Sequence, residues 1–68
     1  MSGYAPHQQR VIDERAALDV KTWALKAFID GSPNFGGLPE AERMRLYAQH
    51  RTMVTYLTIL DERIAAFV

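Results

Sequence analysis

Apolar residues recur along two long stretches of this chain in alternating steps of three and four, with polar residues set between them at regular intervals. Steps of three and four place residues on one face of an α-helix. The pattern predicts two amphipathic helices whose seams combine apolar and polar layers. The first seam comprises Val11, Glu14, Leu18, Lys21, Leu25 and Phe28. The second comprises Leu46, Gln49, Met53, Tyr56, Leu60, Arg63 and Phe67.

A short stretch rich in glycine and proline separates the two seams. Gly31 can end the first helix in a left-handed conformation, and Pro33 prevents the helix from continuing. Pro39 suits the first turn of the second helix. We expect a flexible lead-in followed by one hairpin domain. The expected ranges are a lead-in at 1–7 and a hairpin at 8–68, with helices at about 8–30 and 39–67 around a loop at 31–38.

The short loop predicts the fold class: an all-α, antiparallel two-helix hairpin. Residues whose numbers sum to about 70 should then face each other across the hairpin. Residues 53–60 have high β-propensity, but the seam runs through them without a turn residue, which favours a helix. Phe35 and Leu38 are apolar in an otherwise polar loop, so we expect them to fold back over the end of the hairpin.

A hairpin of 68 residues buries little surface and usually needs a disulfide, a metal or oligomerisation to be stable. The chain has no cysteine, and its two histidines are far apart in sequence, which leaves oligomerisation. A second apolar stripe on the first helix faces away from its seam, where the second helix cannot cover it. We therefore expect a homo-oligomer that forms through this stripe. Its members are Ile12, Ala16, Val20, Trp23 and Ala27.

One cluster of side chains on the second helix has the chemistry of a small anionic-ligand site. Arg43, Tyr47, His50 and Arg51 share a face by their spacing. A guanidinium binds phosphate through two hydrogen bonds, and an aromatic ring stacks on a base. We expect Arg43, Arg51 and Lys26 to meet phosphates, and Tyr47 or Trp23 to stack on a base. The alternative is a solvated polar helix face without a ligand.

Other classes of function fit the sequence poorly. The formal net charge of zero disfavours generic nucleic-acid binding, and no apolar run is long enough to span a membrane. No signal peptide is recognisable, so we expect a cytoplasmic protein. Neighbouring acidic residues point about 100° apart on a helix, and no serine lies in a nucleophile motif. We expect no enzymatic activity, no cofactor and no bound metal.

The positions of both seams, together with Phe35 and Leu38, resemble a pattern in small phage and prophage proteins. These include a hairpin family first labelled in crAss-like phages, and the resemblance covers residues 9–67. The chain is also similar, more loosely, to phage anti-defence sponges of the anti-CBASS and anti-Thoeris types. That likeness implies a homo-oligomer that sequesters a cyclic nucleotide or an ADP-ribose derivative in the host cytoplasm. No binding residue follows from it, since the Gly-Tyr-Arg and Asn-x-x-Lys stretches of the anti-CBASS type are missing.

The sequence therefore supports two hypotheses about function. The first is a non-enzymatic phage-type protein that sequesters a nucleotide immune signal at protomer interfaces. The alternative is a small helical adaptor or inhibitor whose exposed stripe docks on a host or phage protein. The first requires basic pockets at a symmetric interface, whereas the second requires only an exposed groove.

Overall fold

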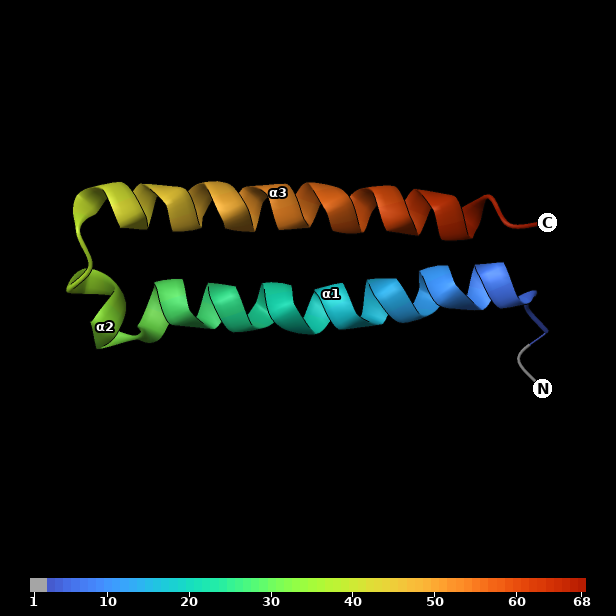
Figure 1. Ribbon diagram of the computed structural model, residues 1–68, viewed down its shortest axis with the longest axis horizontal. Coiled ribbons are helices and arrows are strands. Elements are labelled where there is room, and N and C mark those ends of the chain that lie inside the picture. The colour runs from blue at the N-terminus through green and yellow to red at the C-terminus, as the bar shows by residue number, and fades with distance from the viewer. Residues whose placement is uncertain (1–2) are drawn as a thin grey trace.

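The computed structural model describes residues 3–68, in which the chain forms three helices: α1 (Pro6–Gly31), α2 (Pro33–Gly36) and α3 (Glu40–Ala65). Helices α1 and α3 run antiparallel along a rod of 47 × 19 × 14 Å, with α2 at the closed end and the start of α1 and the end of α3 at the other (Figure 1). The expected all-α hairpin is confirmed. Helix α1 begins two residues earlier than the sequence suggested, and residues 1 and 2 of the predicted lead-in lie outside the described range.

The start and end of α1 follow from its local sequence. Pro6 occupies the first helical position, and the Gln8 side chain accepts a 2.9 Å hydrogen bond from the backbone N–H of Ala5. The predicted left-handed Gly31 is wrong, because Gly31 is helical and Ser32 ends the helix in an extended conformation (φ −87°, ψ 127°). Pro33 disfavours the helical region for the residue before it, which explains this ending. The Ser32 hydroxyl then caps α2 through the N–H of Asn34.

The β-prone segment near the middle of α3 is helical, as the seam predicted. Three threonine hydroxyls on this helix donate to carbonyl oxygens four residues earlier: Thr52 to Ala48, Thr55 to Arg51 and Thr58 to Val54, at 3.0–3.2 Å. These bonds satisfy the hydroxyls inside a helix that their propensity would not favour. The helix is continuous from Glu40 to Ala65.

The face of α1 that meets α3 differs from the predicted seam by one residue at alternate layers. Val11, Leu18 and Leu25 lie toward α3 as expected, but Glu14 and Lys21 are exposed. Their neighbours Arg15 and Thr22 take those layers instead, and Thr22 is buried with its hydroxyl bonded to the Leu18 carbonyl. From Val11 onward, the inner face of α1 therefore advances in steps of four and then three, whereas the predicted seam advances in steps of three and then four.

The same one-residue shift occurs on α3. Leu46, Met53, Leu60 and Phe67 are on the inner face as predicted. Gln49, Tyr56 and Arg63, predicted between them, are exposed. The side chains that take these layers are half-buried, and two of them are apolar. They are Arg43, His50, Leu57 and Ile64.

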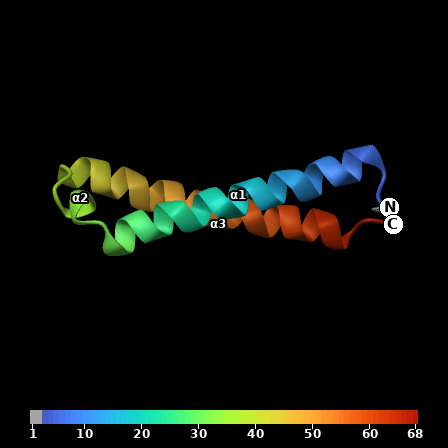
Figure 2. The same ribbon diagram turned by 90° about the horizontal axis from the view of Figure 1, so that it is seen from below.

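The pairing of the two helices is shifted by about six residues from the predicted register. Arg15 Nε donates to Asp61 Oδ1 at 2.8 Å, so facing residue numbers sum to about 76 rather than 70. The cause is α2, which lies beyond the end of α1, so that α3 begins farther out along the rod than a simple turn would place it (Figures 1 and 2). The short helix thus sets which residues of α1 and α3 meet.

Little of the described chain is buried. Val11, Thr22, Phe35 and Leu60 are the buried residues, and Leu60 is fully inaccessible. Phe35 of α2 packs edge-to-face against Phe28 of α1, with ring centroids 5.9 Å apart, so the expected folding of Phe35 over the hairpin end is confirmed. None of the helices that the structure describes over residues 3–68 has an apolar stretch that could span a membrane.

Candidate functional site

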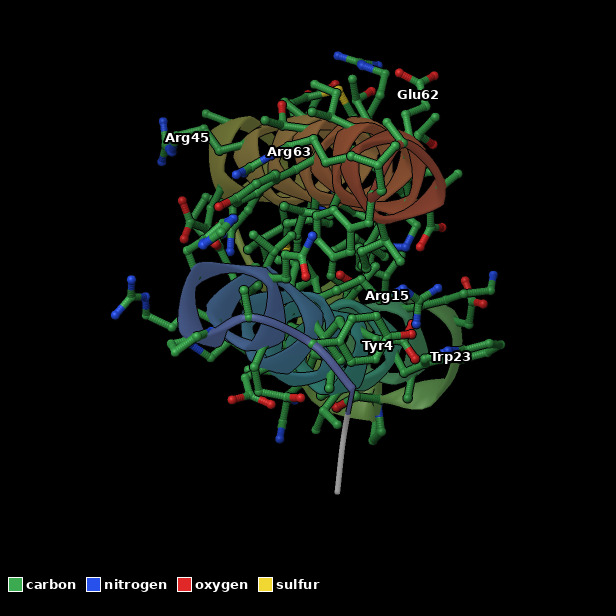
Figure 3. The ribbon with its side chains drawn as sticks, turned by 90° about the vertical axis from the view of Figure 1, so that its right-hand side faces the viewer. Tyr4, Arg15, Trp23, Arg45, Glu62 and Arg63 are labelled. Carbon is green, nitrogen blue, oxygen red and sulfur yellow. The ribbon has the colours of Figure 1, made fainter. Side chains whose placement is uncertain are left out.

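Two lateral faces flank the α1–α3 seam, and the view along the rod separates them. Arg15 and Trp23 point to one side, whereas Arg45 and Arg63 lie toward the other (Figure 3). We call the first side the Trp23 face. By helical phase it comprises Ile12, Ala16, Asp19, Trp23, Lys26 and Asp30 of α1 with Met44, Tyr47, Arg51, Val54, Thr58 and Asp61 of α3. The other side, the Tyr56 face, comprises Arg10, Glu14, Ala17, Lys21 and Ala24 with Arg45, Gln49, Thr52, Tyr56, Ile59 and Arg63.

An open pocket of about 110 Å³ lies beside the seam near the closed end of the hairpin. Lys26, Ile29 and Asp30 line it from α1, and Tyr47 and His50 line it from α3. Within it, Lys26 Nζ and Asp30 Oδ2 form an ion pair of 2.8 Å along one turn of α1. The pocket therefore combines a cation, a carboxylate, an imidazole and a phenol ring over an apolar floor.

Helix α2 positions the aromatic wall of this pocket. The rings of Phe35 and Tyr47 meet edge-to-face at 5.4 Å with an interplanar angle of 82°, which is a favourable aromatic geometry. Since Phe35 itself is buried against Phe28, Tyr47 is held by a fixed neighbour. Tyr47 is still 45% exposed, so part of its surface remains available to stack on a ligand.

The structure brings together three of the six residues predicted to bind a ligand, namely Lys26, Tyr47 and His50. Trp23 and Arg51 lie on the same lateral face but do not line the pocket, and Trp23 is 64% exposed. Arg43 does not line it either. Its Nε is buried, with no hydrogen-bond partner among the described residues.

Sequence reasoning missed Ile29 and Asp30 as pocket residues. Asp30 follows Lys26 by four residues, a spacing typical of helical ion pairs, so this partner was visible in the sequence. Ile29 could be placed only with the correct seam, in which it shares a face with Leu25 and Thr22.

A second ionic cluster lies on the Trp23 face, on the other side of Trp23 from the pocket. Arg15 lies between Asp61 of α3, at 2.8 Å, and Asp19 of its own helix, at 3.3 Å. The hydrogen bond and the negative charge of Asp61, with a smaller contribution from Asp19, raise the pKa of Arg15 above its ordinary value. An arginine is protonated at physiological pH in any case, so Arg15 is a permanent positive charge between these two carboxylates.

The pocket of one protomer is too small to enclose a nucleotide. Sites that enclose drug-sized ligands have volumes of roughly 300–1,000 Å³, whereas this pocket measures about 110 Å³. Asp30 also neutralises Lys26 within the pocket, which weakens its attraction for an anion. One hairpin thus supplies a single wall, with the exposed Tyr47 ring, the Lys26–Asp30 ion pair and the His50 imidazole.

The fold and the pocket define a small helical-hairpin protein with an open pocket on one lateral face. In the comparison with protein families, the Sequestin family model matches residues 5–66. The match spans nearly the whole chain, and the chain belongs to the Sequestin family. No curated protein and no solved structure matches it.

Proposed function

We propose that this protein is a non-enzymatic, phage-type anti-defence protein that sequesters a nucleotide immune signal, a cyclic oligonucleotide or an ADP-ribose derivative, at an interface between protomers. The observation that carries the proposal is the open pocket where Lys26, Tyr47 and His50 meet. Tyr47 stacks on a base, and the cations of the surrounding face bind phosphate. The family name, Sequestin, fits a sequestering role.

The size of the pocket supports a site shared between copies of the chain. A pocket of about 110 Å³ needs a further wall before it can surround a base and its phosphates. Trp23 and Val54, 64% and 44% exposed, lie on the same lateral face and offer an apolar surface for that contact. Self-association through the Trp23 side of α1 then completes the site.

The proposal is tested by native mass spectrometry of the purified protein, alone and with cyclic dinucleotides, cyclic trinucleotides and ADP-ribose derivatives. We expect a discrete oligomer that gains ligand mass in a symmetric stoichiometry. An oligomer that takes up none of these compounds would contradict nucleotide capture. It would favour the alternative of an adaptor or inhibitor that docks on a host or phage protein.

Replacing Arg51 by alanine should weaken nucleotide capture by about 10-fold or more, because charge-assisted hydrogen bonds to a phosphate are each worth about 1.5–3 kcal/mol. Arg51 is exposed and close to Tyr47 on the same helix face, so the fold and the oligomer should persist. Isothermal titration calorimetry with the ligand found in the screen measures the change.

Arg45→Ala is the matched control for Arg51→Ala. Arg45 is an exposed arginine of the same helix, but it lies on the Tyr56 face, where it pairs with Glu42 at 2.7 Å. Its loss should leave the dissociation constant unchanged within about twofold. Equal losses in both variants would show that capture depends on overall charge and not on this site.

A further inference from the structure

We propose that the Trp23 face binds a second copy of this chain in antiparallel orientation, about a two-fold axis that passes beside Trp23. In this dimer, Asp19 of each protomer lies opposite the partner's Lys26. The inference rests on the self-association in the proposed function, but it needs no ligand. It specifies the face, the direction and the alignment of the two copies.

The charges of α1 on this side form a self-complementary series around Trp23. In chain order they are Arg15, Asp19, Lys26 and Asp30, so the signs run positive, negative, positive, negative. Arg15 and Asp30 are equally distant from the midpoint between residues 22 and 23, and so are Asp19 and Lys26. An antiparallel copy aligned on that midpoint places every charge opposite one of the other sign. A parallel pairing of the two α1 helices would place each charge against its own equivalent, which is repulsive.

These four side chains are accessible for such pairing. The exposed fractions of their side chains are 35% for Arg15 and Asp19, 50% for Lys26 and 58% for Asp30. Within one protomer they already form two ion pairs, Arg15 with Asp19 and Lys26 with Asp30, and Arg15 also pairs with Asp61 of α3. The antiparallel dimer joins each pair to the oppositely ordered pair of the partner, giving two networks of five charges, each of which includes one Asp61. Such networks contribute more than isolated surface pairs.

The apolar centre of the face fits the same alignment. In the register set by Arg15 and Asp61, Trp23 of α1 lies across from Val54 of α3, and both are exposed in the single protomer. This position is within about two residues, or roughly 3 Å, of the middle of the rod. With a two-fold axis at this position, the two rods pack against each other over almost their whole length.

The area of the face matches the requirement of a stable dimer. The rod measures 47 Å by 19 Å across its lateral faces, or about 900 Å² in projection. Specific protein interfaces bury about 800 Å² per partner. Ala16 and Ala27 flank Trp23 with small side chains, which allows the two α1 helices to approach closely.

This arrangement also completes the candidate site. The alignment that pairs Asp30 with the partner's Arg15 brings the partner's α1 over the pocket of Lys26, Tyr47 and His50. Each pocket then gains a second wall that includes the partner's Arg15. The dimer has two such sites, related by the two-fold axis.

The test uses two charge reversals that are repulsive alone and complementary together. In an Asp19→Lys dimer, the introduced ammonium group faces the partner's Lys26 twice, and in a Lys26→Asp dimer, two carboxylates face each other twice. We expect each variant alone to dimerise at least about 10-fold more weakly than the unmodified protein. In an equimolar mixture of the two variants every opposed pair is attractive, so we expect a heterodimer of near-normal affinity. Sedimentation velocity and native mass spectrometry measure both quantities.

Recovery in the mixture excludes unfolding as the cause of the losses, because the mixture contains the same altered helices. Lys21→Asp is the matched control, since Lys21 is an exposed lysine of α1 on the opposite, Tyr56 face, and its reversal should leave dimerisation unchanged. Failure of the mixture to recover, or a monomeric unmodified protein, would overturn the inference. If the mixture fails while the unmodified protein still forms an oligomer that takes up nucleotide, the proposed function stands and only this geometry falls.

Discussion

Replacing Leu60 by alanine should unfold most of the protein. Leu60 is the one described residue with no accessible surface, on the face of α3 that packs against α1. Truncating a buried leucine to alanine costs about 2–5 kcal/mol, and a single core of this size rarely supplies more than about 3–5 kcal/mol. The loss therefore approaches the entire stability of a hairpin. Far-ultraviolet circular dichroism during thermal and urea unfolding measures it.

Ile59→Ala provides the control for this truncation. Ile59 precedes Leu60 in the same helix and is 48% exposed, on the Tyr56 face. The substitution removes a similar volume and has a similar effect on helix propensity, so it should cost less than about 1 kcal/mol. If the two substitutions destabilised the protein equally, the contact between α1 and α3 would not depend on Leu60.

Trp23→Ala is expected to abolish self-association while leaving each helix formed. Trp23 is 64% exposed in the single protomer, so its ring adds little to the packing of α1 on α3. Tryptophan at the centre of an interface commonly contributes about 2 kcal/mol or more. Two copies per dimer therefore predict a rise in the dissociation constant of roughly a thousandfold. Analytical ultracentrifugation over a concentration series measures the change.

Tyr56→Ala is the aromatic control on the opposite face. Tyr56 is 40% exposed and belongs to α3, so its removal tests whether any large exposed ring matters for assembly. We expect the dissociation constant to stay within a few-fold of that of the unmodified protein. A stable assembly of Trp23→Ala, or loss of assembly only in Tyr56→Ala, would assign the interface to the Tyr56 face.

The helices and their antiparallel order could be predicted from the sequence, but the phase of the seams could not be read from α1 alone. A repeat of Val11, Leu18 and Leu25 is equally compatible with layers at 14 and 21 or at 15 and 22, and all four of these residues are polar. Propensity and hydropathy do not distinguish them.

The residues that identify the correct phase of the seams lie in α3. At two of its ambiguous layers the choice is between Tyr56 and Leu57 and between Arg63 and Ile64, and the more apolar residue of each pair faces α1. Choosing Leu57 and Ile64 would have fixed the phase of α3. The opposing helix would then have followed, because a buried apolar layer needs a neighbour that covers it.

The register of α1 against α3, and with it the α3 side of the candidate site, depends on the short helix α2, which the sequence showed only indirectly. Lys26 meets Tyr47 and His50 because α2 shifts the start of α3 along the rod, whereas Gly31 and Pro33 indicated only that the first helix ends there. A four-residue helix leaves almost no periodic pattern to detect. Phe35 was the one indication in the sequence, because an aromatic side chain in a loop is buried only where other residues pack against both faces of its ring.

The small number of buried residues has a consequence for the abundance of the protein in a cell. A chain with so little interior has a folded population that depends on what covers its lateral faces, and the stability of an obligate dimer rises with its own concentration. If the second copy provides that cover, newly made chains below the dimerisation threshold remain open to proteolysis. The protein would then accumulate only if it is synthesised rapidly and at a high level. Dilution below the dimerisation threshold would expose it to proteolysis again, without a dedicated degradation signal.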